Sequence, residues 1–211
     1  MTARVDGEKR CRAVAVGLTG GIGAGKSTAL AVFKELGALT ISADRVVHDL
    51  YTRPPLLRRL VEHFGAEILD GDGRLDRRLL ATLLRGRHDE LRWVEGLIHP
   101  LVAQEIRSFI DQAPPTSVVV CEVPLLFEVG YEAMFDLLVT VEASHEQRLA
   151  RNADRFERDS FLEFERLQAS TARRAAGSHF VFCNDGDIEA LHSFVRTVYE
   201  RASGILRGAG E

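Results

Sequence analysis

The stretch Gly20 to Ser27, "GGIGAGKS", has the residue types and spacing of a phosphate-binding loop. It fits G-x-x-x-x-G-K-S/T and lies between an apolar run at 13–18, an expected strand, and an expected helix at 27–36. Glycine has no Cβ, so backbone N–H groups can converge on a phosphate, and the start of the helix adds the positive end of its dipole. A chance match in a glycine-rich turn is the alternative. The strand and the helix on either side favour a site for a nucleoside triphosphate.

Lysine is rare in this chain, which makes the lysine of the loop informative. Lysine occurs only at positions 9, 26 and 34, and the other 24 of the 27 basic residues are arginine. The ammonium group of Lys26 is a compact charge that can reach the β- and γ-phosphates, whereas a guanidinium group is a planar fork. The Ser27 hydroxyl is an expected Mg²⁺ ligand, and Thr28 is placed to contact the α-phosphate. With ATP and Mg²⁺ as the expected cofactors, the predicted nucleotide-binding residues are Gly20, Gly21, Gly23, Ala24, Gly25, Lys26, Ser27 and Thr28.

Other features separate the classes of protein that carry such a loop. A GTPase needs the guanine-reading motif N-K-x-D, and none of the lysines lies in one. The stretch "DGDG" at 70–73 suggests a calcium loop, but Arg74 stands at a ligand position, so we expect a surface turn. A kinase needs a carboxylate that accepts the proton of the attacking hydroxyl. Asp44 follows the expected strand at 38–41, at the sheet edge where ligands bind, and is equally suited to be a helix N-cap.

Strands that alternate with helices predict an α/β fold in which helices cover both faces of a parallel sheet. The five expected strands are 13–18, 38–41, 117–123, 135–143 and 179–184. We expect a three-layer P-loop sandwich with this five-stranded sheet, a helical insertion and a helical lid. The predicted core comprises 1–50, 114–143 and 178–211, the substrate-binding insertion 51–113, and the lid 144–177. Cys121 and Cys183 are expected to be small core residues at strand ends.

Composition limits the partners and the location of the protein. The chain has 211 residues, of which 45% are hydrophobic and 27% charged, and a net charge of −4, which argues against nucleic acid as the main partner. Its first twelve residues lack the apolar stretch of a signal peptide, and no later apolar run has the roughly 18 residues of a membrane span. We therefore expect a cytoplasmic protein, with a monomer favoured and no membrane partner.

Five blocks of the sequence together resemble the dephospho-CoA kinases. They are "GLTGGIGAGKST", "ISAD", "HFGAEILDGDGRLDRRLL", "LIHPLV" and "VPLLFEVG", in the order of the family and spread over about residues 13–136. The resemblance implies ATP-dependent phosphorylation of the ribose 3′-hydroxyl of dephospho-CoA, the last step of coenzyme A synthesis. It also implies that Asp44 is the catalytic aspartate. Ser42 replaces an acidic residue that is usual in the family.

The same resemblance implies a set of substrate contacts. Arg77 would face the CoA moiety and His99 the substrate pocket, although taken alone they are typical of a solvated arginine and a packed histidine. His99-Pro100 is also expected to end one helix and start another. Pro124 and Leu125 follow the strand at 117–123, and we include them among the substrate-binding residues. Glu122 and Glu128 would lie near the phosphate site, or serve as buried ion-pair partners.

The segment 144–177 carries the arginines expected of a lid. Arg148, Arg151, Arg155 and Arg158 recur at three- and four-residue spacing and are predicted to share one helical face, a pattern that is most often solvated. The resemblance implies that one of them closes over the phosphates as a catalytic arginine, with Arg155 as the best match and Arg151 as the next choice. The family usually has a glutamine in this region. Ser170 stands at the position expected for it, and Gln168 comes two residues earlier.

Two alternatives to a dephospho-CoA kinase stay open at the level of sequence. One is another P-loop kinase of small metabolites or nucleosides, which has no reason to carry all five blocks. The other is a nucleotide-binding regulatory protein that has lost catalysis. Intact Lys26, Ser27 and Asp44 argue against the latter.

Overall fold

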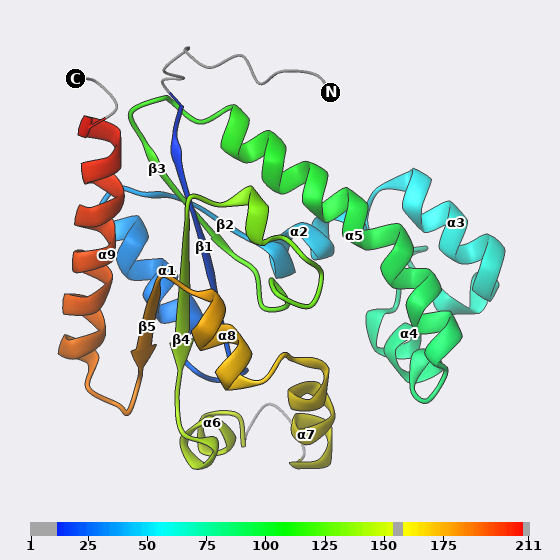
Figure 1. Cartoon of the computed structure of the whole chain (residues 1–211). Coiled ribbons are helices and arrows are strands. Elements are labelled where there is room, and N and C mark those ends of the chain that lie inside the picture. Colours follow the sequence, from blue (N-terminus) through cyan, green and yellow to red (C-terminus); the bar gives the residue numbers. More distant parts are fainter. Residues whose placement is uncertain (1–11, 154–157, 209–211) are drawn as a thin grey trace, which may run out of the picture. The chain divides into compact units, whose positions relative to one another are not determined.

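A computed structural model of the chain describes residues 12–153 and 158–208 (Figure 1). The described residues divide into two compact units. The first, the core unit, comprises the described parts of Met1–Ile41 and Phe109–Glu211, and the second, the helical unit, is Ser42–Ser108. Each unit is considered by itself. The predicted boundaries of the insertion and of the lid stay predictions.

The core unit is built on the sheet that the alternating pattern predicts. Its strands are β1 (Val14–Gly20), β2 (Leu39–Ser42), β3 (Val118–Glu122), β4 (Leu137–Glu142) and β5 (Phe180–Cys183). They are arranged in the order β2-β3-β1-β4-β5, and β1 pairs in parallel with β3 and β4, as β4 does with β5. The five-stranded P-loop architecture is therefore confirmed. The loop after β1 follows the carboxyl end of this central strand, so it lies at the carboxyl edge of the sheet, where ligands bind in such folds.

Apolar side chains on one face of this sheet form the main core. Successive strand residues point to opposite faces, so alternate valines of β1, β3 and β4 face the same helices. These helices are α1 (Lys26–Glu35) and α9 (Ile188–Gly208), which pack side by side against the sheet in Figure 1. Phe33 of α1 and Val195 of α9 are fully buried in this core. The core fixes α1, and with it the end of the glycine loop.

The opposite face of the sheet is covered by α8 (Thr171–Gly177), where the backbones approach closely. A Cβ added at Gly177 would lie 2.5 Å from a ring atom of Phe127, and one added at Gly17 of β1 would lie 2.7 Å from a ring atom of Phe135. Glycine is therefore required at both positions by the space available. Helix α8 itself packs against β1, which leads into the loop, and against β4.

The predicted single face of lid arginines is wrong. Helix α6 (His145–Arg151) ends at Arg151, and the next described helix, α7, spans Arg158–Leu167, so Arg148 and Arg151 lie on a different helix from Arg158. The side chain of Asn152 donates a hydrogen bond to the carbonyl oxygen of Arg148 at 2.7 Å, competing with continuation of the helical ladder. Arg155 lies outside the described residues.

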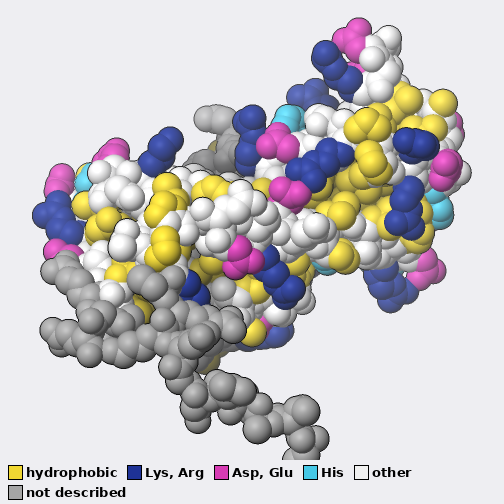
Figure 2. All heavy atoms as spheres, turned by 90° about the horizontal axis from the view of Figure 1, so that it is seen from above, with side chains coloured by type: hydrophobic (Ala, Val, Ile, Leu, Met, Phe, Trp, Pro, Cys, Tyr) yellow, Lys and Arg dark blue, Asp and Glu magenta, His cyan; other side chains and the backbone are white. Residues whose placement is uncertain are grey.

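The helical unit consists of three short helices, a 3₁₀ turn and most of one long helix around an apolar centre. Its elements are α2 (Ala43–Leu50), α3 (Pro54–Phe64), the 3₁₀ turn η1 (Ala66–Ile68), α4 (Arg77–Leu84) and most of α5 (His88–Asp111). Leu60 and Ile68 are fully buried in it, whereas arginine side chains are scattered over its surface among apolar ones (Figure 2). The DGDG stretch is the surface turn that we predicted, since one Asp70 carboxylate oxygen accepts the N–H groups of Asp72 and Arg74 at 2.9 Å each.

The predicted helix boundary at His99-Pro100 is wrong, because α5 continues through Pro100. Proline removes one hydrogen bond of the helical ladder and usually kinks or breaks a helix. Here Val94, Ile98, Val102 and Ile106 are all buried at a spacing of four residues. Burial of this apolar stripe outweighs the missing hydrogen bond.

The two strand cysteines differ in exposure. Cys121 of β3 is fully buried, as predicted, but Cys183 at the end of β5 is exposed. Strand β5 lies at the edge of the sheet, and Phe180 and Phe182, rather than Cys183, pack against the core. Among the described residues, no helix is long and apolar enough to cross a membrane.

Candidate active site

The glycine loop connects the end of β1 to the start of α1 in a conformation that requires its glycines. Gly20, Gly23 and Gly25 have φ angles of 144°, 74° and 104°. A Cβ at Gly20 would lie 1.9 Å from the carbonyl oxygen of Val141, and one at Gly23 would lie 2.0 Å from the side-chain nitrogen of Asn152. Side chains at these two positions are excluded by both angle and space. The sequence therefore places bare backbone and a helix start together, which suits an anion.

Lys26 and Ser27 lie at the start of α1 with their polar groups at the carboxyl edge of the sheet. Lys26 is buried, and its ammonium group donates to the carbonyl oxygens of Gly20 at 3.1 Å and Gly21 at 3.0 Å. The hydroxyl group of Ser27 donates to a carboxylate oxygen of Glu122 at 3.3 Å. Glu122, the last residue of β3, is buried, whereas Ser27 and Thr28 are exposed. A hydroxyl and a carboxylate oxygen, both hard donors, thus lie next to the loop.

A glutamine that the sequence analysis did not assign to the site contacts the loop directly. The side-chain oxygen of Gln168 accepts the N–H of Ile22 at 2.9 Å. Its amide nitrogen donates to the carbonyl oxygens of Gly20 at 3.2 Å and Pro124 at 3.1 Å. Pro124 and Leu125 leave β3 beside the loop and are partly buried. The sequence carried one signal for this contact, the glutamine expected near position 170, and the structure shows that Gln168 makes it.

The far half of the loop is held by residues from α6 and from the end of β5. The side chain of Asn184 is buried and donates to the carbonyl oxygen of Ala24 at 2.8 Å. Arg151 donates to the carbonyl oxygens of Gly23 at 3.3 Å and Asn184 at 3.1 Å. Of the two arginines considered for the lid, Arg151 thus lies at the loop.

Two ion pairs lie next to the glycine loop, since a Cβ added at Gly21 would lie 3.1 Å from Arg148 and 3.2 Å from Glu142, one member of each pair. Arg174 of α8 binds both carboxylate oxygens of Glu142, at 2.5 and 2.9 Å, and both residues are buried. Arg148, also buried, pairs with Glu165 of α7. Burial would raise the pKa of Glu165, but hydrogen bonds from Arg148 and His145 outweigh it, so this pKa is below its ordinary value. Arg148 is thus not the solvated arginine that its spacing suggested.

Glu128, in the segment after β3, has no ionic partner among the described residues, so its predicted ion pair is not formed there. One of its carboxylate oxygens accepts the N–H of Ala169, and the other is buried without a hydrogen-bond partner among the described residues. The residue thus fastens the loop after α7 to the segment that follows β3.

The helical unit contains the predicted base and the predicted substrate arginine. Asp44 is exposed in the first turn of α2, and Ser42 is at the N-cap position without a side-chain cap, so the N-cap interpretation of Asp44 is wrong. His48 lies one turn after Asp44 and Tyr51 about two turns after it, on the same helical face. Arg77 is 2.9 Å from the Nδ1 atom of His48 and lies over the Tyr51 ring at 6.0 Å. Burial raises the pKa of Tyr51, and the charge of Arg77 opposes this.

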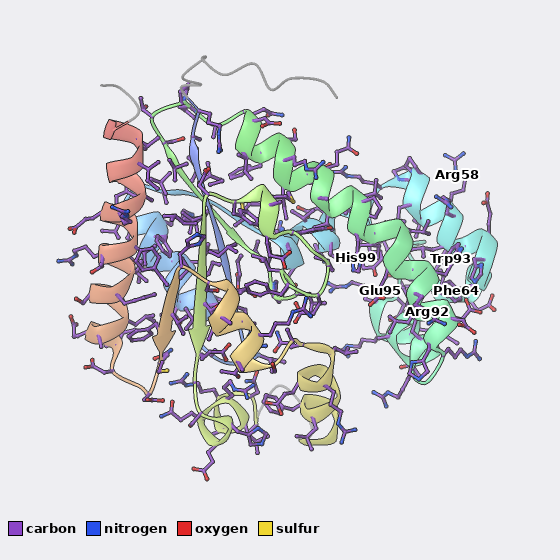
Figure 3. All side chains as sticks on the ribbon, in the orientation of Figure 1. Arg58, Phe64, Arg92, Trp93, Glu95 and His99 are labelled. Atoms are coloured by element: carbon purple, nitrogen blue, oxygen red, sulfur yellow. The ribbon has the colours of Figure 1, made fainter. Side chains whose placement is uncertain are left out.

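His99 lies on α5, where Figure 3 shows it one turn beyond Glu95 and further along the helix than Trp93. It is partly buried. Near the start of α5, Trp93 stacks on the ring of His63 at a centroid distance of 3.9 Å and contacts Phe64 edge-on at 5.8 Å. The assignment of His99 to the substrate pocket stays a prediction.

Comparison with known proteins gives consistent matches. A family model described as dephospho-CoA kinase matches residues 14–190. A dephospho-CoA kinase of Streptomyces avermitilis is 38% identical over 188 residues, which cover 87% of this chain and 91% of that protein. One of Leptospira interrogans is 32% identical over 193 residues, 90% of this chain and 93% of that protein.

Solved structures agree with this result at the level of the fold. The crystal structure of TT1252 from Thermus thermophilus has a TM-score of 0.76 and 30% identity, and the match covers 90% of this chain and 98% of that one. A dephospho-CoA kinase from Campylobacter jejuni, 19% identical, has a TM-score of 0.62 over 90% of this chain and 97% of its own. A shikimate kinase from Bacteroides thetaiotaomicron, 16% identical, has a TM-score of 0.52, with 89% and 97% covered. The last two similarities concern the fold alone.

Proposed function

Since the chain belongs to the dephospho-CoA kinase family, we propose that it transfers the γ-phosphoryl group of ATP to the ribose 3′-hydroxyl of dephospho-CoA. The products are coenzyme A and ADP. The match of the family model to residues 14–190 carries the proposal, and the glycine loop supplies the chemistry that the reaction needs. Loss of catalysis is disfavoured because Lys26, Ser27 and Asp44 are all present.

The glycine loop binds ATP in this proposal. Backbone N–H groups of the loop and of the start of α1 stabilise the phosphates, except those of Ile22 and Ala24, which donate to Gln168 and to the carbonyl oxygen of Gly21. Lys26 neutralises charge on the β- and γ-phosphates. Ser27, with Glu122 at 3.3 Å, would hold Mg²⁺, because this ion prefers hard oxygen donors and is usually bound by few protein groups together with phosphate and water. When bound, Mg²⁺ would neutralise charge that develops on the phosphate oxygens. Among the described residues no cluster of three His, Cys, Asp or Glu side chains offers a complete protein cage.

Asp44 is the proposed general base. Its carboxylate would orient the ribose 3′-hydroxyl and accept the proton that this group loses as its oxygen attacks phosphorus. It is exposed and its side chain does not cap α2, so it can meet a substrate. A base of this kind contributes about 10²- to 10⁴-fold in rate.

The remaining residues would bind the two substrates. Arg77, oriented by His48 and Tyr51, would contact an anionic group of dephospho-CoA, and His99, Pro124 and Leu125 would contact the rest of it. Arg155 is the proposed catalytic arginine of the lid. The cytoplasmic location and the monomeric state stay predictions.

A coupled assay of ADP release tests the proposal. The wild-type protein, with ATP, Mg²⁺ and dephospho-CoA, should turn over, and Asp44→Asn should lower kcat by about 10²- to 10⁴-fold. The matched control is Asp49→Asn on the same helix, where the carboxylate pairs with Arg45 and both side chains are exposed. Turnover that survives Asp44→Asn would remove Asp44 from its role. No turnover with dephospho-CoA, in a protein that binds ATP, would refute the proposed reaction.

A further inference from the structure

Gln168 contacts two segments of the core unit that are remote in sequence from it and from each other. It follows the last residue of α7, and its side chain bonds to the first half of the glycine loop and to the segment that leaves β3. The partner atoms are the N–H of Ile22 at 2.9 Å and the carbonyl oxygens of Gly20 at 3.2 Å and Pro124 at 3.1 Å. Both donor hydrogens of the amide are engaged. The orientation of the amide is also fixed, because the opposite one would face the nitrogen toward an N–H and the oxygen toward two carbonyls.

The carbonyl oxygen of Gly20 links this contact to the chemistry. It accepts one hydrogen bond from Gln168 and one from the ammonium group of Lys26, at 3.1 Å. A carbonyl oxygen has two lone pairs, so both donors can be accommodated. This oxygen, whose position Gln168 helps to set, therefore contributes to holding Lys26, together with the carbonyl oxygen of Gly21 at 3.0 Å. Lys26 is the residue that we propose to meet the β- and γ-phosphates.

The backbone next to Gln168 is also anchored, which makes the side chain a rigid contact. The N–H of Ala169 donates to Glu128, and the carbonyl oxygen of Ala169 accepts from Arg174. Arg174 is in turn bound to Glu142 of β4. The residue that follows Gln168 is thus held at both its N–H and its carbonyl group, the first by the segment after β3 and the second through Arg174 by β4.

We propose that Gln168 is a positioning residue of the kinase, which orients the first half of the glycine loop and Lys26 for binding of ATP. The inference rests on the proposed function only in taking ATP as the nucleotide. It predicts that loss of Gln168 weakens the binding of ATP but not the binding of dephospho-CoA. Loss of positioned hydrogen bonds to a buried group weakens binding by about 10- to 100-fold.

Two variants of similar size separate positioning from simple loss of stability. Gln168→Met removes all three hydrogen bonds, and Gln168→Glu keeps an acceptor for the N–H of Ile22 but presents oxygen atoms to the carbonyls of Gly20 and Pro124. In both variants we expect the KM for ATP, and the Kd of a non-hydrolysable ATP analogue with Mg²⁺ measured by calorimetry, to rise about tenfold or more. The KM for dephospho-CoA should stay within about twofold of wild type. Hydrogen exchange of the Ile22 amide should be faster in Gln168→Met and remain slow in Gln168→Glu.

The control is Gln104→Met, at an exposed position of α5 in the helical unit, which should leave all of these values unchanged. Binding of the analogue within twofold of wild type in both Gln168 variants would overturn the inference. So would a parallel rise of both KM values, which indicates general damage to the fold. If the wild type binds the analogue but does not turn over dephospho-CoA, the proposed function fails, and the calorimetry and the exchange of Ile22 still decide the role of Gln168.

Discussion

Replacing Arg174 by methionine should lower the free energy of unfolding by about 3–5 kcal/mol. Arg174 and Glu142 are exposed to only 3% and 4%, and the guanidinium group binds both carboxylate oxygens, at 2.5 and 2.9 Å. Methionine fills a similar volume but leaves the carboxylate of Glu142 buried without its cation. The penalty arises mainly from this unpaired charge rather than from lost packing.

The size of the effect can be measured by urea unfolding and by melting temperature. For a chain of this length, 1 kcal/mol corresponds to about 2–4 °C, so the variant should melt roughly 6–20 °C below wild type. The double variant Arg174→Met with Glu142→Leu has no buried charge at this position. It should regain most of the loss, because replacing a buried ion pair by apolar groups is often close to neutral.

The two single variants and the double variant form a cycle that isolates the pair. Arg174→Lys is a second control, since it keeps the positive charge but cannot form the two-pronged contact. A loss below about 1 kcal/mol for Arg174→Met would contradict the reasoning, because such a small loss is typical of exposed ion pairs. A double variant as unstable as Arg174→Met would show that the lost packing, and not the unpaired charge, dominates.

Three further predictions concern residues of the core unit. The pKa of Glu165 is lowered because hydrogen bonds from Arg148 and His145 outweigh its burial. Wild type should therefore have a larger free energy of unfolding than Glu165→Gln at pH 7. This difference should fade as the pH drops from about 4.3, the ordinary pKa of glutamate, through the lowered pKa. A difference in the free energy of unfolding that is constant with pH would contradict this. Burial raises the pKa of Cys121 to about 12, so alkylation of the native protein at pH 8, mapped by mass spectrometry, should leave this thiol unmodified. Gly20→Ala should abolish binding of ATP, because its Cβ would lie 1.9 Å from a backbone oxygen, whereas Gly21→Ala meets only side-chain atoms at 3.1–3.2 Å and should be milder. Equal effects of the two alanines would speak against the steric argument.

The sequence predicted the elements whose signals are local. The strand before the loop, the glycines and the helix start occupy about fifteen consecutive residues, and their spacing alone predicts the anion site. The predicted helix boundary at His99-Pro100 was wrong, because burial of every fourth residue of α5 outweighs the hydrogen bond that the proline removes. This burial is visible only in the folded unit. The prediction that Cys183 is a core residue was wrong, because the sequence of a short apolar strand does not show whether the strand lies at the edge or the centre of a sheet.

The contacts that shape the loop were out of reach of local patterns. Gln168 meets Ile22 across 146 residues, and Asn184 meets Ala24 across 160. No periodicity or spacing of residues in a single sequence predicts either contact. They form because α6, α7 and β5 return the chain to the carboxyl edge of the sheet, where β1 ends.

These remote side chains also account for the chemistry of the loop. A peptide unit is planar and trans, so a carbonyl group that is held on one side turns the following N–H to the other side. Gln168 and Lys26 hold the carbonyl of Gly20, and Asn184 holds that of Ala24 at 2.8 Å. The N–H groups of Gly21 and Gly25, which share these peptide units, therefore point away from these donors, to the side where we expect an anion to bind. Glycine makes this backbone conformation possible, but the amide side chains from the segments after α7 and β5 select it. We therefore expect nucleotide binding by the loop to depend on residues more than 140 positions away from it.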